Sequence, residues 1–377
     1  MTELRRILVL AFLSLIVFHR APSAQAQVTS QPWAEAASTD VVLDGHTVIN
    51  MVPDFLDFWE EASTKPLRVQ RSLWTRMVEN KYRDYFDRAV YRGADPETRR
   101  EMLDRFLLQV PARIDRLSRF NMIAADSVVQ GLVAFKSRFP DYQQQRDIYI
   151  GISLFTFDGS VRPVSNSLLI PDTLCLGADV LSSYSPDQLK IAIVHEIFHL
   201  YHFRFLFNGI YKLYHHGLVL DRMVLTKLFA PYIPLMVEGM AVAASEEIYP
   251  GYPLTMYLHF SEAQLAEQQQ NLAANASTFL GMIHDGAIPF EYDKWFNGSY
   301  EFVPKRGGYL LGYQVVREAM SGDLLEQPAD SSLREGAVNS SSLEQMIKLT
   351  PGELGARAAS ELSSIITSKV FLIASRD

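Results

Sequence analysis

Apolar side chains between about Ile49 and Phe139 recur mostly at intervals of three to five positions. That spacing places them on one face of a helix, so the pattern predicts several packed helices in this part of the chain. Asp95-Pro96-Glu97 is typical of a helix start, because it combines a capping side chain, a first-turn proline and an acid. Another helix is expected to end near Phe139-Pro140.

The pattern changes to that of strands after residue 147. Ile148 to Phe155 is a short run of β-forming residues, and the following Asp158-Gly159 is typical of a turn. Leu168 to Leu176 is a second apolar run, and it contains Pro171. Because proline donates no hydrogen bond, we expect this second strand at a sheet edge, where an extended substrate peptide could add to it.

A strongly marked helix begins at Ser185. Ser185-Pro186-Asp187-Gln188 combines an N-cap, a proline at the first helical position, a first-turn acid and a capping-box glutamine. The residues from Leu189 to Leu200 are almost entirely apolar, which predicts a buried helix. Apart from Lys190, the polar residues within it are His195, Glu196 and His199.

Buried histidine and glutamate side chains are costly unless they are paired or bind a metal ion. His195 and His199 are four residues apart, so both imidazoles lie on one helix face and can reach one tetrahedral cation. Glu196 is about 100° further round the helix, beside the expected ion, where a general base belongs. The segment matches HExxH. The alternative is a pair of core histidines hydrogen-bonded to the backbone.

A metal ion held by this pair needs a third protein ligand. His202 lies on nearly the same helix face, but about 10.5 Å along the axis from His195, so it suits the surroundings of the ion better than the ligand set. Glu238 is the better candidate, because it is a single carboxylate in the apolar helix predicted around Pro234–Ala244. Small residues there would let this helix approach the His195 helix closely. The alternative for Glu238 is a helix end that faces solvent.

Residues 1–26 have the pattern of a secretory signal peptide. Arg5 and Arg6 precede an uncharged apolar run from Ile7 to Phe18, and Ala24-Gln25-Ala26 offers a cleavage site. Because the apolar run is short for a membrane span, we expect no stable membrane insertion after signal cleavage, with an uncleaved anchor as the alternative. The predicted location is therefore secreted or periplasmic.

Composition narrows the classes of function. The chain has 377 residues, 48% of them apolar and 21% charged, which is typical of a globular protein. It has 35 Lys and Arg against 43 Asp and Glu, a net charge of -8, and no nucleic-acid partner is expected. The single cysteine, Cys175, excludes an intrachain disulfide and a cysteine-based zinc finger, and we expect it to be buried.

The motifs resemble the gluzincins, zinc peptidases in which HExxH is followed by a ligand glutamate on a second helix, often as Glu-Gly-x-Ala. Here that second segment is Glu238-Gly239-Met240-Ala241. The order of parts is also similar to a group of bacterial predicted zinc-dependent proteases, in which a Gly- and Tyr-rich helix follows, as in Gly308 to Tyr313.

The resemblance implies zinc (Zn²⁺) bound by His195, His199 and Glu238, with Glu196 as the base. Two histidines and a glutamate with one open position are a catalytic zinc arrangement. One departure from several gluzincins is that the next acids after Glu238 are Glu246 and Glu247, two turns on.

We therefore predict an α+β fold, mainly helical, with a zincin-like catalytic lobe, a small mixed sheet ahead of the HExxH helix and a helical C-terminal subdomain. In ranges, this gives a signal peptide at 1–26, a helical N-terminal region at 27–140, the catalytic domain at 141–320 and a helical tail at 321–377.

The expected activity is hydrolysis of a peptide or protein substrate by a zinc-activated water. Tyr309 and Tyr313 are candidates to stabilise the oxyanion, and the resemblance favours Tyr313, although each is also suited to simple packing. His215-His216 is a further candidate. The alternative functions are a non-catalytic zincin-like protein that binds zinc or peptides, with chaperone or envelope-assembly work, and a helical binding module in which HExxH is accidental. The oligomeric state is not predicted.

Overall fold

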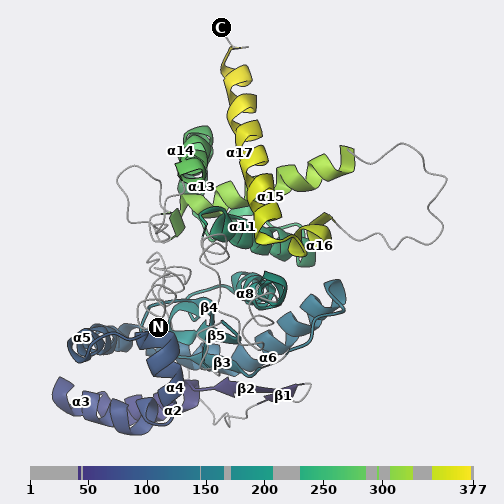
Figure 1. The fold of residues 1–377 in the computed structure, drawn as a ribbon. Coiled ribbons are helices and arrows are strands. Elements are labelled where there is room, and N and C mark those ends of the chain that lie inside the picture. Colours follow the sequence, from purple (N-terminus) through teal and green to yellow (C-terminus); the bar gives the residue numbers. More distant parts are fainter. Residues whose placement is uncertain are drawn as a thin grey trace, which may run out of the picture. The chain divides into compact units, whose positions relative to one another are not determined.

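The computed structural model describes residues 41–43, 46–144, 146–164, 171–206, 230–285, 295–296, 306–325 and 342–374 (Figure 1). The chain divides into two compact units. Ile16–Leu200 is called the sheet unit here, and Tyr201–Asp377 together with Met1–Leu15 is called the helical unit. The signal peptide predicted for residues 1–26 lies outside the described residues.

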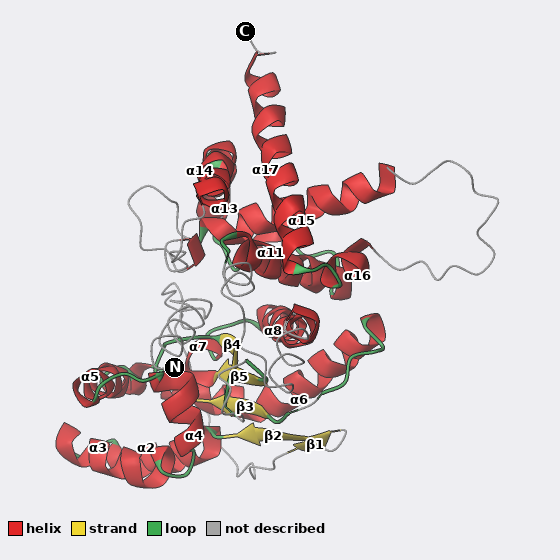
Figure 2. Cartoon of the chain, in the orientation of Figure 1, coloured by secondary structure: helices red, strands yellow, loops and turns green. Residues whose placement is uncertain are grey.

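The sheet unit is built on a mixed five-stranded sheet (Figure 2). Its strands are β1 (Val41–Leu43), β2 (His46–Asn50), β3 (Ile148–Gly151), β4 (Gly159–Arg162) and β5 (Thr173–Gly177). They lie in the order β1-β2-β3-β5-β4, with β2, β3 and β5 parallel and both end strands antiparallel to their neighbours. The strand predicted at Ile148 is thereby confirmed. The sheet also contains β1 and β2, which the sequence pattern did not predict.

The prediction that the second apolar run forms an edge strand is wrong. β5 lies between β3 and β4, so it has a partner on each side. Pro171 stands before the first residue of β5, where it removes no hydrogen bond from the ladder. The idea that a substrate peptide adds to Leu168–Leu176 loses its basis with this finding. Residues 165–170 lie outside the described residues.

The predicted turn at Asp158-Gly159 is also different in the structure. Gly159 is the first residue of β4, and β4 ends the sheet among the described strands. Gly159 pairs with Leu176 of β5. The aspartate and glycine therefore lead straight into a strand.

The helices predicted between Ile49 and Phe139 are confirmed. They are α2 (Val52–Ala62), α3 (Leu67–Trp74), the π-helical turn η1 (Thr75–Glu79), α4 (Arg83–Tyr85), the π-helical turn η2 (Phe86–Tyr91), α5 (Pro96–Leu107), the 3₁₀ turn η3 (Val110–Ala112) and α6 (Ile114–Arg138). Asp95 caps α5 by accepting hydrogen bonds from the backbone N–H groups of Glu97 and Thr98. The same unit holds α7 (Ala178–Leu181), and α8 (Pro186–Leu206) contains the boundary between the units.

One face of the sheet carries α6 and α8. Asn50 of β2 donates a hydrogen bond from Nδ2 to Oδ1 of Asn121 in α6, over 2.8 Å. α6 approaches α8 closely at Gly131, where a Cβ atom would lie 2.5 Å from Cγ2 of Ile193. Only a residue without a side chain allows this contact between the two helices.

The opposite face is covered by aromatic side chains of the N-terminal helices. Tyr85 stacks on Tyr149 of β3, with ring centroids 5.6 Å apart. A buried aromatic cluster then extends from Tyr85 through Phe86 to Trp74. Because strand side chains alternate between faces, this face also holds Cys175, the register partner of Tyr149.

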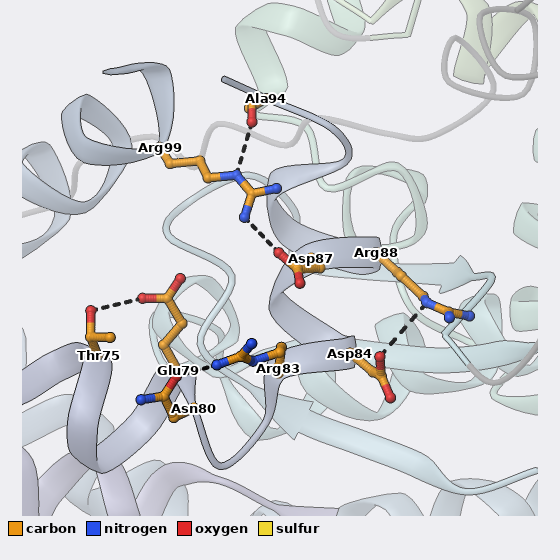
Figure 3. A network of polar contacts seen from close by, with 9 residues as sticks. All are labelled: Thr75, Glu79, Asn80, Arg83, Asp84, Asp87, Arg88, Ala94 and Arg99. Carbon is orange, nitrogen blue, oxygen red and sulfur yellow. Dashed lines mark hydrogen bonds and ion pairs between the residues drawn. The ribbon is translucent and has the colours of Figure 1, made fainter. Parts of the chain in front are cut away.

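Polar contacts connect the short helices beside this cluster (Figure 3). Arg99 donates from Nε to the carbonyl oxygen of Ala94 over 2.8 Å, and its Nη1 lies 2.5 Å from Asp87 Oδ1. Arg88 and Asp84 form a longer ion pair of 3.9 Å. These side chains are partly exposed, so each contact adds little stability by itself, but together they fix the turns between η1 and α5.

The helical unit consists of helices alone among its described residues. They are α11 (Tyr232–Ile248), α12 (Leu254–Leu258), α13 (Glu262–Gln270), α14 (Leu272–Asp285), α15 (Gly307–Leu325), α16 (Ser342–Ile347) and α17 (Pro351–Ala374). Two of these helices, α16 and α17, lie in the predicted helical tail. None of the helices in the described part of the chain is both long and apolar enough to cross a membrane.

Glycines allow α11 and α15 to touch. A Cβ atom at Gly312 would lie 2.3 Å from the carbonyl oxygen of Leu235, and one at Gly239 would lie 2.2 Å from the carbonyl oxygen of Gly312. Gly312 and Gly239 thus allow the two helix backbones to approach closely. The small residue Gly239 serves this contact with α15.

Gly312→Ala should therefore destabilise the protein, because its methyl group meets backbone atoms that cannot rotate away. We expect a loss of about 1–3 kcal/mol in the free energy of unfolding, measured by urea denaturation. Gly281→Ala is the matched control, since Gly281 is also helical and has no neighbour within 4 Å of the new Cβ atom. The control should be neutral or slightly stabilised. Equal effects of the two substitutions would contradict this account of the α11–α15 contact.

Candidate metal centre

The helix that carries the candidate site, α8, begins as the sequence predicts. The backbone N–H of Ser185 donates to Oε1 of Gln188 over 2.9 Å, and the N–H of Gln188 donates to Oγ of Ser185 over 3.2 Å. This reciprocal capping box satisfies two N–H groups that have no partner within the helix. The start of α8 is therefore fixed, and with it the direction of every side chain that follows.

His195, Glu196 and His199 lie together on α8. The Nε2 atoms of the two histidines are 3.1 Å apart, and their rings are nearly perpendicular at 84°. One ligand atom from each of the three side chains lies within 4.8 Å of the others, and all three side chains are buried. Among the described residues, no other group of His, Cys, Asp and Glu is close enough to hold a metal ion.

The separation of the two imidazoles fits a shared metal ion. Two nitrogen atoms that each bind a tetrahedral zinc at about 2.0–2.1 Å lie about 3.3 Å apart. The observed 3.1 Å agrees with that value. The same separation suits a hydrogen bond in which one ring N–H donates to the other ring. The buried group can therefore hold a metal ion, and its two histidines already face one point.

Glu196 projects against the end strand of the sheet. The three atoms nearest to a Cβ placed on Gly159 all belong to Glu196, and its Cγ would be only 2.3 Å away. The side chain of Glu196 thus lies against Gly159 of β4, beside the histidine pair. This contact was not predicted, because Asp158-Gly159 reads locally as a turn.

Asp158 connects this part of β4 to the residues before α8. Its Oδ1 accepts a hydrogen bond from the N–H of Gly159 over 2.7 Å, and its Oδ2 accepts one from the hydroxyl of Tyr184 over 2.6 Å. Its carbonyl oxygen accepts a third from the N–H of Gly177 over 2.6 Å. One side chain and its backbone therefore link β4, β5 and the segment that leads into the metal helix.

A buried carboxylate, Asp179, holds the loop that precedes β4. It accepts hydrogen bonds from the N–H groups of Ser153 and Phe155, over 2.7 and 2.6 Å. Leu154 and Phe155 both have positive φ, 54° and 60°, which costs energy for residues with a side chain. Burial raises the pKa of Asp179 to about 6, although the backbone donors oppose that shift.

A buried guanidinium lies on the other face of β4. Arg162 is 1% exposed and its guanidinium lies over the ring of Phe157, at 4.8 Å. Burial lowers the pKa of Arg162 well below its ordinary value, with Arg92 acting in the same direction and the charge of Glu196 among those that oppose it. Because residues alternate between faces, Arg162 and Gly159 point to opposite sides of the sheet.

The predicted third ligand, Glu238, belongs to the helical unit. It lies in the middle of α11 and is 3% exposed, so the predicted burial is confirmed and the alternative of a solvent-facing helix end is wrong. Its role as a ligand stays a prediction. His202 is fully buried one turn beyond His199 on α8. His215 and His216 lie outside the described residues.

The two candidate tyrosines lie on α15 in the helical unit. Tyr313 donates a hydrogen bond from its hydroxyl to Oε2 of Glu246 over 2.7 Å, and Arg317 lies 3.6 Å from the same oxygen. Burial, followed by the hydrogen bond to Glu246, raises the pKa of Tyr313. Tyr309 is buried, with its ring edge-on to Phe296. Their catalytic roles stay predictions.

Comparisons with known proteins do not assign this chain to a family. No protein-family model matches it, and neither curated proteins nor solved structures give a significant match. The resemblance to gluzincins therefore rests on the HExxH segment of α8 and on the Glu-Gly-x-Ala segment of α11.

The pKa of Asp179 predicts a pH dependence of stability. Since the folded-state pKa is raised above the ordinary 3.8 to about 6, the folded protein binds the proton more tightly than the unfolded chain. The stability that this residue contributes is thus present below about pH 4 and is lost as the pH rises through about 6, an effect of about 3 kcal/mol. In urea titrations, the unfolding free energy of the wild type minus that of Asp179→Asn should therefore decrease as the pH is raised from 4 to 7.

Asp95→Asn is the control, because the pH dependence of the stability that Asp95 contributes has the opposite sign. The pKa of Asp95 is lowered by the N–H groups that it caps, so its contribution is present at neutral pH and is lost as the pH falls. A difference between wild type and Asp179→Asn that stays constant with pH would contradict the shift given for Asp179.

Proposed function

We propose that this protein is a zinc-dependent peptidase that acts in a secreted or periplasmic location. The observation that carries the proposal is the buried group on α8, in which the Nε2 atoms of His195 and His199 lie 3.1 Å apart and the carboxylate of Glu196 lies beside them. Three buried polar side chains within the mostly apolar stretch from Leu189 to Leu200 are expected where a metal ion offsets the cost of their burial. The HExxH spacing adds a base to two ligands.

Zinc is the metal that these residues suit best. Imidazole nitrogen and carboxylate oxygen are common zinc ligands, and a site with three protein ligands leaves one position for water or substrate. The chain has one cysteine, which is buried in the sheet and does not belong to this group. When bound, zinc lowers the pKa of a water molecule towards about 7 and polarises a carbonyl group.

Glu196 has the role of proton carrier in this proposal. It accepts a proton from the attacking water and delivers it to the leaving amine, which makes the reaction an amide hydrolysis without a covalent intermediate. The residue is suited to that role because it follows the first histidine directly and is held beside the pair by the backbone of β4. A centre that only binds metal has no need of this carboxylate.

Glu238 is proposed as the third ligand. Its support is that a carboxylate buried in the middle of an apolar helix is costly unless hydrogen bonds, an opposite charge or a metal ion compensate it, and a metal ion is one such partner. Tyr313 and Tyr309 stay the candidates for oxyanion stabilisation. Tyr313 would then have to exchange the carboxylate of Glu246 for the substrate oxygen.

Glu196→Gln tests the reaction. The amide keeps the size of the side chain but cannot accept the proton, so zinc should stay bound while cleavage of an unfolded protein or a peptide library falls by about 10²–10⁴-fold. Zinc is measured by elemental analysis and cleavage by mass spectrometry. Unchanged cleavage by the variant would remove the proposed mechanism. A wild type that binds zinc but cleaves nothing would favour the non-catalytic alternative.

Glu238→Gln tests the third ligand. An amide is a poor zinc ligand, so the affinity for zinc should fall at least about tenfold in a competition titration with a chelator. Glu246→Gln is the matched control on the same helix, because this substitution removes a charge near Tyr313 without touching the proposed ligands. His199→Ala should abolish zinc binding. Wild-type affinity in Glu238→Gln would exclude this residue from the ligand set.

A further inference from the structure

The close contact between Gly159 and Glu196 joins the end strand of the sheet to the proposed proton carrier. A Cβ atom at position 159 would lie 2.3 Å from Cγ, 2.8 Å from Cδ and 3.0 Å from Oε1 of Glu196. These separations are shorter than ordinary van der Waals contact. Any side chain at position 159 would therefore have to move the carboxylate arm or the strand.

The backbone of Gly159 does not itself require glycine. The glycines with positive φ among the described residues are Gly93 and Gly251, and Gly159 is not one of them. It occupies a regular strand position opposite Leu176. A side chain at position 159 would therefore fit the strand backbone but would collide with Glu196.

The strand beneath Glu196 is well held. The N–H of Gly159 donates to Asp158, and Asp158 also accepts hydrogen bonds from Gly177 and from the hydroxyl of Tyr184. Because Tyr184 immediately precedes the capping box of α8, the surface that supports Glu196 and the start of its helix are tied together. A methyl group at Gly159 would therefore move the flexible glutamate side chain more readily than the strand.

A general base must lie within hydrogen-bond reach of the proton that it accepts, and displacement by about 1 Å can lower the rate about 100-fold. A glutamate side chain has three rotatable bonds, so its carboxylate needs a support to stay in one place. In this site the support is the backbone of β4 at Gly159, which carries no side chain.

We propose that Gly159 is a positioning residue for Glu196, and that the bare backbone of β4 at this point sets where the proton acceptor is held. The inference rests on the proposed peptidase function. It predicts that Gly159→Ala lowers kcat about 10- to 100-fold, while KM and the zinc content stay close to those of the wild type.

Gly131→Ala is the matched control. Its methyl group also meets α8, at 2.5 Å from Cγ2 of Ile193, but it lies away from the carboxylate arm. If Gly159 acted only through the packing of α8, both substitutions would lower the thermal midpoint and the activity together. We expect Gly159→Ala to lower kcat more, and the thermal midpoint less, than Gly131→Ala does.

A second measurement tests the contact without using activity. Glu196→Ala removes the atoms that a methyl group at position 159 would meet, so the loss of stability in Gly159→Ala should be recovered when the two substitutions are combined. Additive stabilities in this double-mutant cycle, or a kcat for Gly159→Ala equal to that of the wild type, would overturn the inference. Failure of the proposed function is a distinct result, because the wild type itself would then show no Glu196-dependent cleavage.

Discussion

The burial of two imidazoles and a carboxylate on one apolar helix is the constraint on which the rest of the structure depends. Each of these groups loses its hydration when the protein folds, and the loss must be offset by a neighbour or an ion. On α8 the two rings offset it by meeting at one point, and Glu196 rests on the strand next to them. The capping box, the sheet and the neighbouring helix all act to keep that helix in one orientation.

Local features of the site could be predicted from the sequence, because they depend on residues a few positions apart. The capping box at Ser185, the cap of α5 at Asp95 and the shared face of His195 and His199 all follow from helix geometry. The strand order could not be predicted, since Pro171 indicates an edge strand only if it lies within the hydrogen-bonded ladder, and it stands just outside it. The contact between Gly159 and Glu196 could not be predicted either, because the two residues lie far apart in the sequence, on β4 and on α8.

Glycines set the close approaches in both units, and around α8 they act from two directions. Gly131 brings α6 against Ile193, and Gly159 brings β4 against Glu196. A helix held at two such points has little freedom to rotate about its axis or to slide. The absence of side chains at these two positions thus helps to orient the histidine pair, at the cost of the larger conformational entropy that glycine loses on folding.

Cys175 has a use that does not depend on catalysis. It is the single cysteine of the chain and lies buried in β5, between the two neighbouring strands. Burial raises the pKa of its thiol, which keeps it in the unreactive neutral form while the sheet is intact. A thiol-labelling reagent therefore reacts with the native protein only when the centre of the sheet opens, so the labelling rate reports the frequency of that opening without any engineered probe.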